Sequence, residues 1–383
     1  MSERLQVDVT IIGGGIAGCA AAVALRHAGL TVVVLEKDLC GAGASGVNFG
    51  GVRQQGRDLA ELPLARRARP LWDELDEKLG EDVEFEATGH LKLARSDADM
   101  AQLERYAEDA AAHGLRLQLL GAGTLRSAAP WIGPGVVGAS LCAEDGQANP
   151  RRVGPAFARL ARRLGADVRE HETVLSAAHC GSGFEIRTDR LDVHSRFLVN
   201  CAGVGAGRIA AGFGEDVPLR PLVPNMIVTE PLPFFIDRSI GVCGGGVYLR
   251  QIARGNAILG GGAGWGDAEC NRSRPQTTTT LDAMAGAIAL VPALAGSLVI
   301  RTWAGIDGAM PDHIPVLGFS ATTPNLVHAF GFSGHGFQLG PVVGEIIAEL
   351  VTEGRSSSPL APFAIERFAG ATTPEKATVD IDP

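Results

Sequence analysis

The strongest constraint on the fold is a β-α-β pattern near the start of the chain. Residues 7–12 and 31–35 are apolar runs typical of buried strands, and residues 16–28 are rich in small residues that favour a helix. Three glycines in a G-x-G-x-x-G pattern mark the turn between the first run and the helix. Strands joined through a helix lie parallel in one sheet, so the pattern predicts an α/β fold.

The same glycines give this turn the properties of a dinucleotide site. Gly13 permits the tight turn, Gly15 leaves space for a pyrophosphate against the backbone, and Gly18 lets the helix press on the strands. The backbone N–H groups at the start of the helix, at Ile16 and Ala17, would face the phosphates.

The end of the second strand supplies a further part of this fingerprint. Glu36 follows the last glycine by roughly the 20 residues that the fingerprint requires, and its carboxylate would accept hydrogen bonds from ribose hydroxyls. We therefore expect a bound dinucleotide; the alternative is a glycine-rich turn without a ligand. The sequence pattern of residues 39–57 differs from that of a nicotinamide dehydrogenase, because these residues form a second run of small and polar side chains. Such a run suits the ribityl chain and ring edge of a flavin.

Length and composition limit the other possibilities. The 383 residues suggest two domains, and the net charge of −9, without a Lys/Arg run, makes nucleic acid an unexpected partner. The seven cysteines are an odd number without a C-x-x-C pair, so neither disulfides nor an iron–sulfur site is expected and a cytoplasmic location fits best. The histidines show no metal-ligand spacing, so no metal is expected. No window of about 18 uncharged apolar residues predicts a transmembrane segment.

The remaining pattern predicts a discontinuous dinucleotide-binding domain and an interleaved substrate domain built on a mainly antiparallel sheet. The first comprises residues 1–80, 145–215 and 300–371, and the second comprises residues 81–144 and 216–299. Helices are expected at residues 60–80, 97–113, 152–164 and 280–290, and strands at 83–94, 168–178, 184–188, 196–201, 219–230, 247–251 and 257–262. Residues 372–383 are expected to form a loose tail.

Four segments of the sequence are informative when they are taken together, in their order along the chain. They are VDVTIIGGGIAGCAAAVALRHAGLTVVVLEK, GASGVNFGG, LVNCAGVGAG, and RTWAGIDGAMPDHIPVLG followed by FGFSGHGFQLGP. Together they resemble the flavin-dependent D-amino-acid oxidase and glycine/sarcosine oxidase superfamily, across residues 5–368. Within this span, NFGGVRQQGR and WAGIDGAMPDHIPVLG are most similar to the B-type subunits of opine oxidases, hydroxyproline dehydrogenases and hydrogen cyanide synthase.

The resemblance implies an oxidoreductase with a Rossmann-like FAD-binding domain. A carbon next to a nitrogen of an amino acid or secondary amine would pass hydride to flavin N5, and the resulting imine would hydrolyse. Non-covalent FAD is expected, because Gly305 stands where monomeric sarcosine oxidases carry a cysteine. Besides the β-α-β residues above, the residues implied around FAD are Lys37, Ala44, Ser45, Asn48, Gly50, Gly51, Val174, Ala202, Gly203, Gly305, Gly331, Gly334, His335, Gly336, Phe337 and Gln338.

The segments expected near the substrate differ in residue type from those of better-known members of the superfamily. Gln338 replaces a lysine that helps sarcosine oxidases bind the substrate carboxylate, and Asp307 stands where glycine oxidases use an arginine. A substrate carboxylate would then need another partner, for which an arginine is suited because it binds a carboxylate through two hydrogen bonds. Each candidate also has a structural alternative as a salt bridge, a strand contact or a turn cap. The candidates are Arg53, Arg57, Tyr248, Arg250, Asp307, His335 and Gln338.

The electron acceptor is expected to differ as well. Ile258 stands where sarcosine oxidases use a lysine to activate oxygen, so we expect a dehydrogenase that passes electrons to a partner subunit or a quinone. Three alternatives stay open: a non-catalytic or electron-relay flavin subunit of a multisubunit dehydrogenase, a biosynthetic amine oxidase whose substrate lacks an α-carboxylate, and an aromatic-type flavin hydroxylase, which the sequence Gly266-Asp267-Ala268 superficially suggests.

Overall fold

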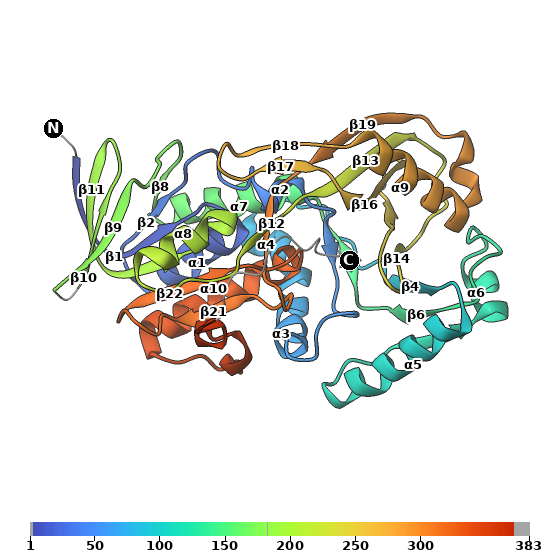
Figure 1. The fold of residues 1–383 in the computed structure, drawn as a ribbon, viewed down its shortest axis with the longest axis horizontal. Helices are drawn as coiled ribbons and strands as arrows, with labels where there is room; N and C mark the ends of the chain where they lie inside the picture. Colours follow the sequence, from blue (N-terminus) through green and yellow to red (C-terminus); the bar gives the residue numbers. More distant parts are fainter. Residues whose placement is uncertain (1–2, 182, 371–383) are drawn as a thin grey trace.

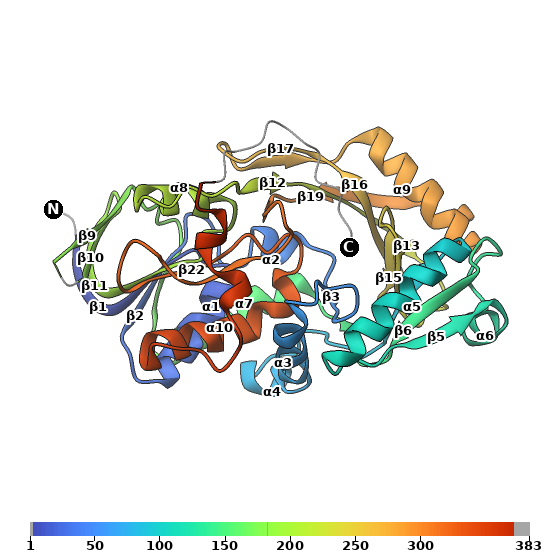
Figure 2. The same cartoon turned by 60° about the horizontal axis from the view of Figure 1, so that its bottom comes forward.

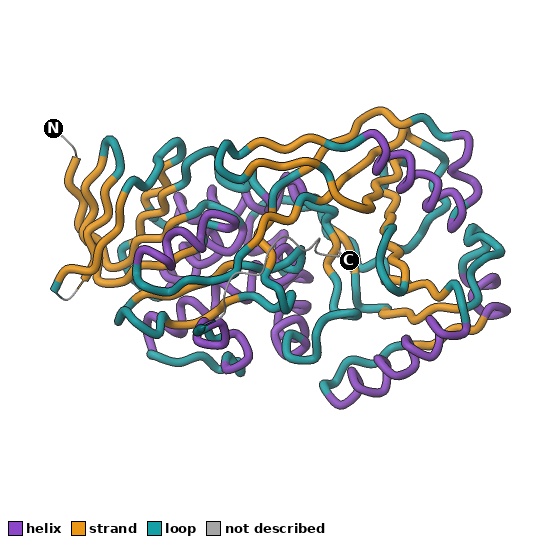
Figure 3. The backbone as a smooth tube through the Cα atoms, viewed as in Figure 1, coloured by secondary structure: helices purple, strands orange, loops and turns teal. Residues whose placement is uncertain are grey.

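The computed structural model describes residues 3–181 and 183–370, so the tail predicted at residues 372–383 lies outside the described residues. Two eight-stranded sheets lie toward opposite ends of an elongated molecule, with helices packed between and over them (Figure 1). The same arrangement is visible in Figure 3, where strands gather at both ends of the chain trace. The predicted α/β class is confirmed.

The first sheet contains the predicted β-α-β unit. Its strands are β1 (Glu3–Ile12), β2 (Val32–Leu35), β8 (Asp167–Arg169), β9 (Ser176–Cys180), β10 (Gly183–Arg187), β11 (Leu191–Asn200), β21 (Val316–Phe319) and β22 (Leu326–Phe330). The main path runs β21-β22-β11-β1-β2-β8, and its five strands from β22 to β8 are parallel. β21 is antiparallel to β22, and β9 and β10 form an antiparallel extension of β11. The polypeptide therefore leaves β1, β2 and β11 at one common edge, where ligands of such sheets bind.

Helices cover one face of this sheet. They are α1 (Ile16–His27), α7 (Pro150–Arg163) and α10 (Gly336–Glu353), with α3 (Leu62–Asp73) and α4 (Leu75–Leu79) packed on the outer side. Val9 and Ile11 of β1 point into this helical core, whereas Ile12 belongs to the core on the opposite face, as the two-residue period of a strand requires. α1 and α10 approach closely because Gly344 has no side chain: a Cβ there would lie 2.5 Å from the carbonyl carbon of Ala20.

The second sheet is mainly antiparallel, as predicted. Its order is β19-β13-β16-β15-β14-β4-β6-β5, and only the β14–β4 pair is parallel. Figure 2 shows α5 and α9 at this end of the molecule. The bounds are β4 (His90–Ala94), β5 (Gln118–Gly121), β6 (Gly138–Cys142), β13 (Pro224–Pro231), β14 (Ser239–Val242), β15 (Tyr248–Gln251), β16 (Asn256–Ala263), β19 (Val299–Ala304), α5 (Asp97–Ala112), α6 (Ala122–Ala128) and α9 (Thr277–Leu290).

Short elements join the two large sheets. Three two-stranded ladders are formed by β3 (Gly51–Val52) with β7 (Gly146–Gln147), β12 (Arg220–Leu222) with β20 (Asp307–Ala309), and β17 (Trp265–Asp267) with β18 (Arg272–Arg274). The remaining helices are α2 (Ala44–Val47), α8 (Ala206–Gly212), and the 3-10 turns η1 (Gly203–Gly205), η2 (Pro292–Gly296), η3 (Ala361–Phe363) and η4 (Ile365–Phe368).

Several helix ends follow from the local sequence. The Ser96 hydroxyl accepts a hydrogen bond from the Asp99 N–H at the start of α5, and the Asn149 side chain does the same for Arg151 at the start of α7. Gly354 ends α10 in the left-handed conformation, with a φ of 71°.

Three predicted boundaries differ from the structure. Residues 168–178 are not one strand, because the chain turns at His171, with a φ of 55°, so that β8 and β9 join different neighbours. In the stretch 83–94 only β4 is a strand, and Glu86 contributes a single bridge to Gln147. The predicted domain boundary at residue 300 falls inside β19, which belongs to the second sheet.

Candidate active site

A long cavity of about 770 Å³ begins at the carboxyl ends of β1, β2 and β11 and extends to the second sheet. Its lining includes Glu36 at the end of β2 and Tyr248 at the start of β15. An extended ligand can therefore contact both sheets at once. Most of the predicted cofactor residues line it: Gly13, Gly15, Ile16, Ala17, Glu36, Lys37, Ala44, Ser45, Asn48, Gly50, Gly51, Val174, Ala202, Gly203, Gly305, Gly331, Gly334, His335, Gly336 and Phe337.

The middle of the cavity has the form of a pyrophosphate cradle. Gly13 adopts a φ of 108°, and a Cβ there would lie 2.2 Å from the carbonyl oxygen of Cys201. At the α1 N-terminus the Ser45 hydroxyl accepts a hydrogen bond from the Ile16 N–H at 2.9 Å, and the first turn holds no acidic residue. The positive end of the helix dipole is thus not neutralised by an acidic side chain, and the N-terminus of α1 favours a bound anion.

The end of the cavity near β2 is suited to a ribose and a base. The Glu36 carboxylate accepts hydrogen bonds from Gly14 N–H at 2.6 Å and from Asp38 N–H at 2.9 Å, which fixes its position beside the cradle. Val174 lines the same end. So does Glu172, which the sequence did not single out; this buried acid is paired with Arg190 at 2.5 Å and hydrogen-bonded by the Thr188 hydroxyl.

The loop around α2 forms one wall between the two ends. The Asn48 amide donates to the carbonyl oxygens of Ala44 and Ser45, and its oxygen accepts from the Gly50 N–H at 2.7 Å. Gly305 packs against this loop, because a Cβ there would lie 2.0 Å from Cγ2 of Val47. A cysteine at position 305 would therefore collide with the wall as it stands.

Buried positive charge gathers at the far end of the cavity. Arg53 is 8% exposed and Arg57 is 4% exposed. The Nη1 atom of each arginine is buried and has no hydrogen-bond partner among the described residues. Burial, reinforced by the neighbouring Arg53, lowers the pKa of Arg57 to about 9. Burial also lowers the pKa of His90 well below its usual value, and Arg53, Lys92 and Arg57 add to the effect. Cations so placed favour an anionic ligand.

His335 is held beside this cluster by a buried acid. Its Nδ1 lies 2.8 Å from Oε2 of Glu61, whose side chain is fully buried. Burial lowers the pKa of His335 to about 4, with Arg57 acting in the same direction and Glu61 opposing. Burial alone would raise the pKa of Glu61, but His335 and the two arginines outweigh it, and the pKa falls. At pH 7 a neutral His335 donates Nδ1–H to a Glu61 carboxylate and keeps Nε2 as an acceptor.

Two further predicted substrate residues line the same end. The Tyr248 ring meets Phe49 edge-on, with ring centroids 4.9 Å apart, and its hydroxyl donates to Sδ of Met226 at 3.3 Å. Burial raises the pKa of Tyr248, so the phenol stays protonated at neutral pH. Asp307 accepts backbone hydrogen bonds from Gly308 at 2.8 Å and Gly334 at 2.9 Å, which makes it a brace for the loop before α10.

Three predicted site residues lie outside the lining. Gly18 packs against the β1 turn instead, since a Cβ there would lie 2.0 Å from the carbonyl oxygen of Gly13. The Arg250 guanidinium lies behind the wall, over the ring of Phe49 at 5.4 Å. The Gln338 side chain donates to the carbonyl oxygen of Ala65 at 2.9 Å, so it ties α10 to α3 rather than facing a ligand.

Besides Glu172, the sequence did not single out His90, which lines the cavity, or Glu61 and Lys92, which lie close to its far end. Glu61 looks like an ordinary helix-start acid, and its partner His335 lies 274 residues away in the sequence. His90 and Lys92 stand on β4 in an apolar run that predicts only a strand. The sequence gave one indication of this charged group, because Arg57 follows Arg53 by four residues and both carry a positive charge.

The cavity fits FAD. It joins a pyrophosphate cradle, an acid for a ribose and a loop of small residues into one continuous channel that ends at a group of buried polar side chains. Such a channel, which starts at the strand ends of a parallel sheet and closes against an antiparallel sheet, is typical of a dinucleotide-binding enzyme.

The chain belongs to the DAO family of FAD-dependent oxidoreductases, whose profile matches residues 8–350. The B-type subunit of opine oxidase from Rhizobium meliloti is 26% identical over 377 residues, which cover 95% of this chain and 98% of that protein. The HcnC subunit of hydrogen cyanide synthase from Pseudomonas aeruginosa is 24% identical over 418 residues, covering 98% of each chain. L-proline dehydrogenase from P. horikoshii shares the fold with a TM-score of 0.89 at 29% identity, covering 96% of this chain and 98% of that one. The expected superfamily and FAD as its cofactor are confirmed.

Within the described part of the chain, no helix is long and apolar enough to cross a membrane. Among the same residues, no three or more His, Cys, Asp or Glu side chains gather as metal ligands would.

Proposed function

We propose that this enzyme oxidises a C–N bond in an amino acid or a secondary amine. The carbon next to nitrogen loses a hydride, the nitrogen loses a proton, and a C=N bond forms; water then hydrolyses this imine to a carbonyl compound and an amine. FAD, when bound, accepts the hydride at N5 and so takes up both electrons. The names of the similar proteins support this class of donor, since L-proline is a secondary amine with a carboxylate.

The observation that carries the proposal is the buried pair of arginines at the end of the FAD cavity. Arg53 and Arg57 each leave an N–H donor without a partner among the described residues. Glu61 and Asp145 act on the charge of Arg57, but they leave these two donors unsatisfied. A buried charged donor without a hydrogen-bond partner is costly, and a substrate carboxylate would satisfy it. This argues against a substrate that lacks an α-carboxylate.

The protein's own contribution is to position the substrate and to select its protonation state. Arg53 would hold the carboxylate, while Nε2 of His335, fixed by Glu61, would accept a hydrogen bond from the substrate nitrogen. The site's positive charge disfavours a protonated amine and so favours the neutral form that can release hydride. The buried rings of Tyr248 and Phe49 would exclude water from the reacting carbon.

An anaerobic screen tests the function directly. The FAD-loaded protein is mixed without oxygen with proline, sarcosine, other N-substituted amino acids and D-amino acids, and the flavin absorbance is followed. At least one amine that carries a carboxylate should bleach the flavin, and the matching amine without the carboxylate should not. If every amine leaves the flavin oxidised while dithionite reduces it, the chain is a non-catalytic or electron-relay subunit.

We also propose that the electrons leave to a partner subunit or a quinone, and that FAD is held non-covalently. Ile258 does not line the FAD cavity, and among the described residues the lysine that lines it is Lys37, next to Glu36. Stopped-flow reoxidation in air should be slower than turnover with an artificial acceptor, and a rate that matches turnover would identify an oxidase. Acid precipitation should release the flavin into the supernatant; flavin retained by the denatured chain would contradict non-covalent binding.

A further inference from the structure

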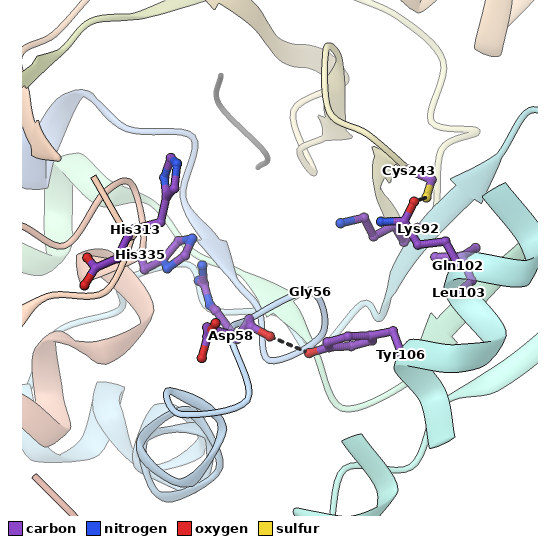
Figure 4. Close-up of a pocket in the computed structure, with 11 residues that line it drawn as sticks. Gly56, Asp58, Lys92, Gln102, Leu103, Tyr106, Cys243, His313 and His335 are labelled. Atoms are coloured by element: carbon purple, nitrogen blue, oxygen red, sulfur yellow. Dashed lines mark hydrogen bonds between the residues drawn. The ribbon is translucent and has the colours of Figure 1, made fainter. Parts of the chain in front are cut away.

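The two ends of the FAD cavity have different surroundings. At the far end, Arg57 and His335 also line a second cavity of about 320 Å³, so the two cavities meet at these side chains. Figure 4 shows Lys92 of β4 and His335 on either side of this second cavity. At the other end, beside Glu36, the FAD cavity is lined in part by the β17–β18 hairpin, which belongs to neither of the two large sheets.

The base of this hairpin is packed firmly on neighbouring strands. The Gly264 N–H donates to the carbonyl oxygen of Val223 at 2.7 Å, and the Ser273 hydroxyl donates to the carbonyl oxygen of Ala304 at 2.9 Å. Gly266 approaches the same surface so closely that a Cβ there would lie 2.6 Å from Cγ2 of Val223. From this anchored base the hairpin extends toward the first sheet (Figure 1).

The tip of the hairpin, residues 268–271, is shaped by its own sequence. Oδ1 of Asp267 accepts the N–H groups of Glu269 at 3.0 Å and Cys270 at 3.1 Å, which fixes the turn locally. Asn271 follows with a φ of 50°, in the left-handed region that asparagine tolerates better than most residues. Glu269 and Asn271 line the FAD cavity, although both are also exposed to solvent. The tip therefore lies at the surface, over the cavity.

A hydrogen bond joins the tip to the β2 side of the cavity. The Asn271 amide donates to Oδ2 of Asp38 at 2.9 Å, across 233 residues of sequence. Asp38 is itself held by Glu36, whose Oε1 accepts the Asp38 N–H at 2.9 Å. All three residues line the FAD cavity. The hydrogen bond thus bridges two walls of the cavity at the end that is suited to a ribose and a base.

We propose that the tip is a clasp that holds the adenosine end of FAD in its cavity, and that the hydrogen bond between Asn271 and Asp38 closes this clasp. FAD leaves the protein after the clasp opens, so the clasp sets the rate of cofactor release. The inference needs FAD as the cofactor and is independent of which amine is oxidised. Because the closing hydrogen bond is exposed to water, its loss accelerates release without abolishing FAD binding.

The dissociation rate of FAD tests the clasp without any substrate. The FAD-loaded protein is mixed with excess 5-deaza-FAD, which absorbs at shorter wavelength, and the loss of the original flavin absorbance gives the rate of release. Replacement of residues 268–271 by Asn-Gly removes the tip and joins the paired residues Asp267 and Arg272 through a two-residue hairpin turn. This variant should release FAD about tenfold faster or more, because it loses every contact of the tip. A release rate equal to that of the wild type would overturn the proposal.

The Asn271→Ala variant tests the closing hydrogen bond alone. It should release FAD about three- to tenfold faster, as expected for the loss of one hydrogen bond. Asn325→Ala is the matched control, because Asn325 has a similar φ, of 62°, in the turn before β22 and does not line the FAD cavity. Both variants strain the backbone alike, so an equal acceleration in the two would assign the effect to strain and refute the clasp.

Exchange of the two partners separates the hydrogen bond from the rest of the tip. Asn271→Asp alone brings two carboxylates together and should accelerate release, whereas the further change Asp38→Asn lets an amide donate to a carboxylate again. The double variant should therefore return to within about twofold of the wild-type rate. Failure to recover would show that this bond does not close the clasp. The melting temperature of the apoprotein should be the same in all these point variants, and a fall that parallels the release rates would show a purely structural role.

Discussion

At the scale of single residues, FAD binding depends on the bare backbone of Gly13. The substitution Gly13→Ala would place a methyl group 2.2 Å from the carbonyl oxygen of Cys201, so the turn must shift. We expect at least tenfold weaker FAD binding, the equivalent of about 1.4 kcal/mol. The measurement is the flavin-to-protein absorbance ratio after purification, followed by titration with FAD.

Gly29→Ala is the control for this substitution. Gly29 also has a positive φ, of 81°, but no atom lies within 4 Å of the position of its Cβ. Both variants carry similar backbone strain, while only one changes the cradle. Equal FAD content in the two variants would show that the Gly13 turn does not contact the cofactor.

The buried His335 predicts how stability depends on pH. Its folded pKa, about 4, lies below the ordinary 6.5, so the unfolded chain binds the proton first as pH falls. Its contribution to stability is present above pH 6.5 and is lost progressively down to pH 4. Between pH 7 and pH 5 this loss amounts to about 2 kcal/mol in the free energy of unfolding. Glu61, whose pKa is lowered from 4.5, acts only below this window.

Denaturant unfolding of His335→Gln at pH 7 and pH 5 measures this contribution. The variant should lose less stability over this interval than the wild type, because glutamine does not titrate. His194→Gln serves as the control, since it removes a histidine that is 55% exposed on β11. Parallel pH dependences in all three proteins would show that His335 titrates normally.

At the scale of elements, the contact between α1 and α10 sets the shape of the cradle. Gly344→Ala puts a methyl group 2.5 Å from the carbonyl carbon of Ala20, and we expect a net destabilisation of about 1–3 kcal/mol despite the helix propensity of alanine. Thermal unfolding checks the direction. The matched change Gly212→Ala at the end of α8, where no atom lies within 4 Å, should be neutral or stabilising by up to about 1 kcal/mol. Equal melting temperatures would contradict tight α1–α10 packing.

The elements also show what the sequence could predict. The β1–α1–β2 unit was predictable because apolar runs, small residues and glycines specify it locally. The separation of β8 from β9 was not, because it depends on which distant strand each one joins. The same holds in the site: the glycine cradle follows from a short motif, whereas the Glu61–His335 pair forms only through the packing of α3 beside α10.

At the scale of the whole molecule, the two sheets share one ligand cavity, so FAD should stabilise them together. When free FAD is present at about 1,000 times its dissociation constant, binding raises the free energy of unfolding of the protein by about 4 kcal/mol. For a chain of this size we expect the melting temperature to rise by about 5 °C over the apoprotein, with one cooperative transition.

Differential scanning calorimetry of the apoprotein, with and without added FAD, measures this rise. ADP is the informative comparison, because it fills the Glu36 end and leaves the Arg53 and Tyr248 end empty. At equal free concentration ADP should stabilise the protein less than FAD does, since it does not reach the second sheet and therefore binds more weakly. If the ADP complex melted as one transition at the same temperature as the FAD complex, the second sheet would gain nothing from the flavin, and the cavity would not couple the two parts of the fold.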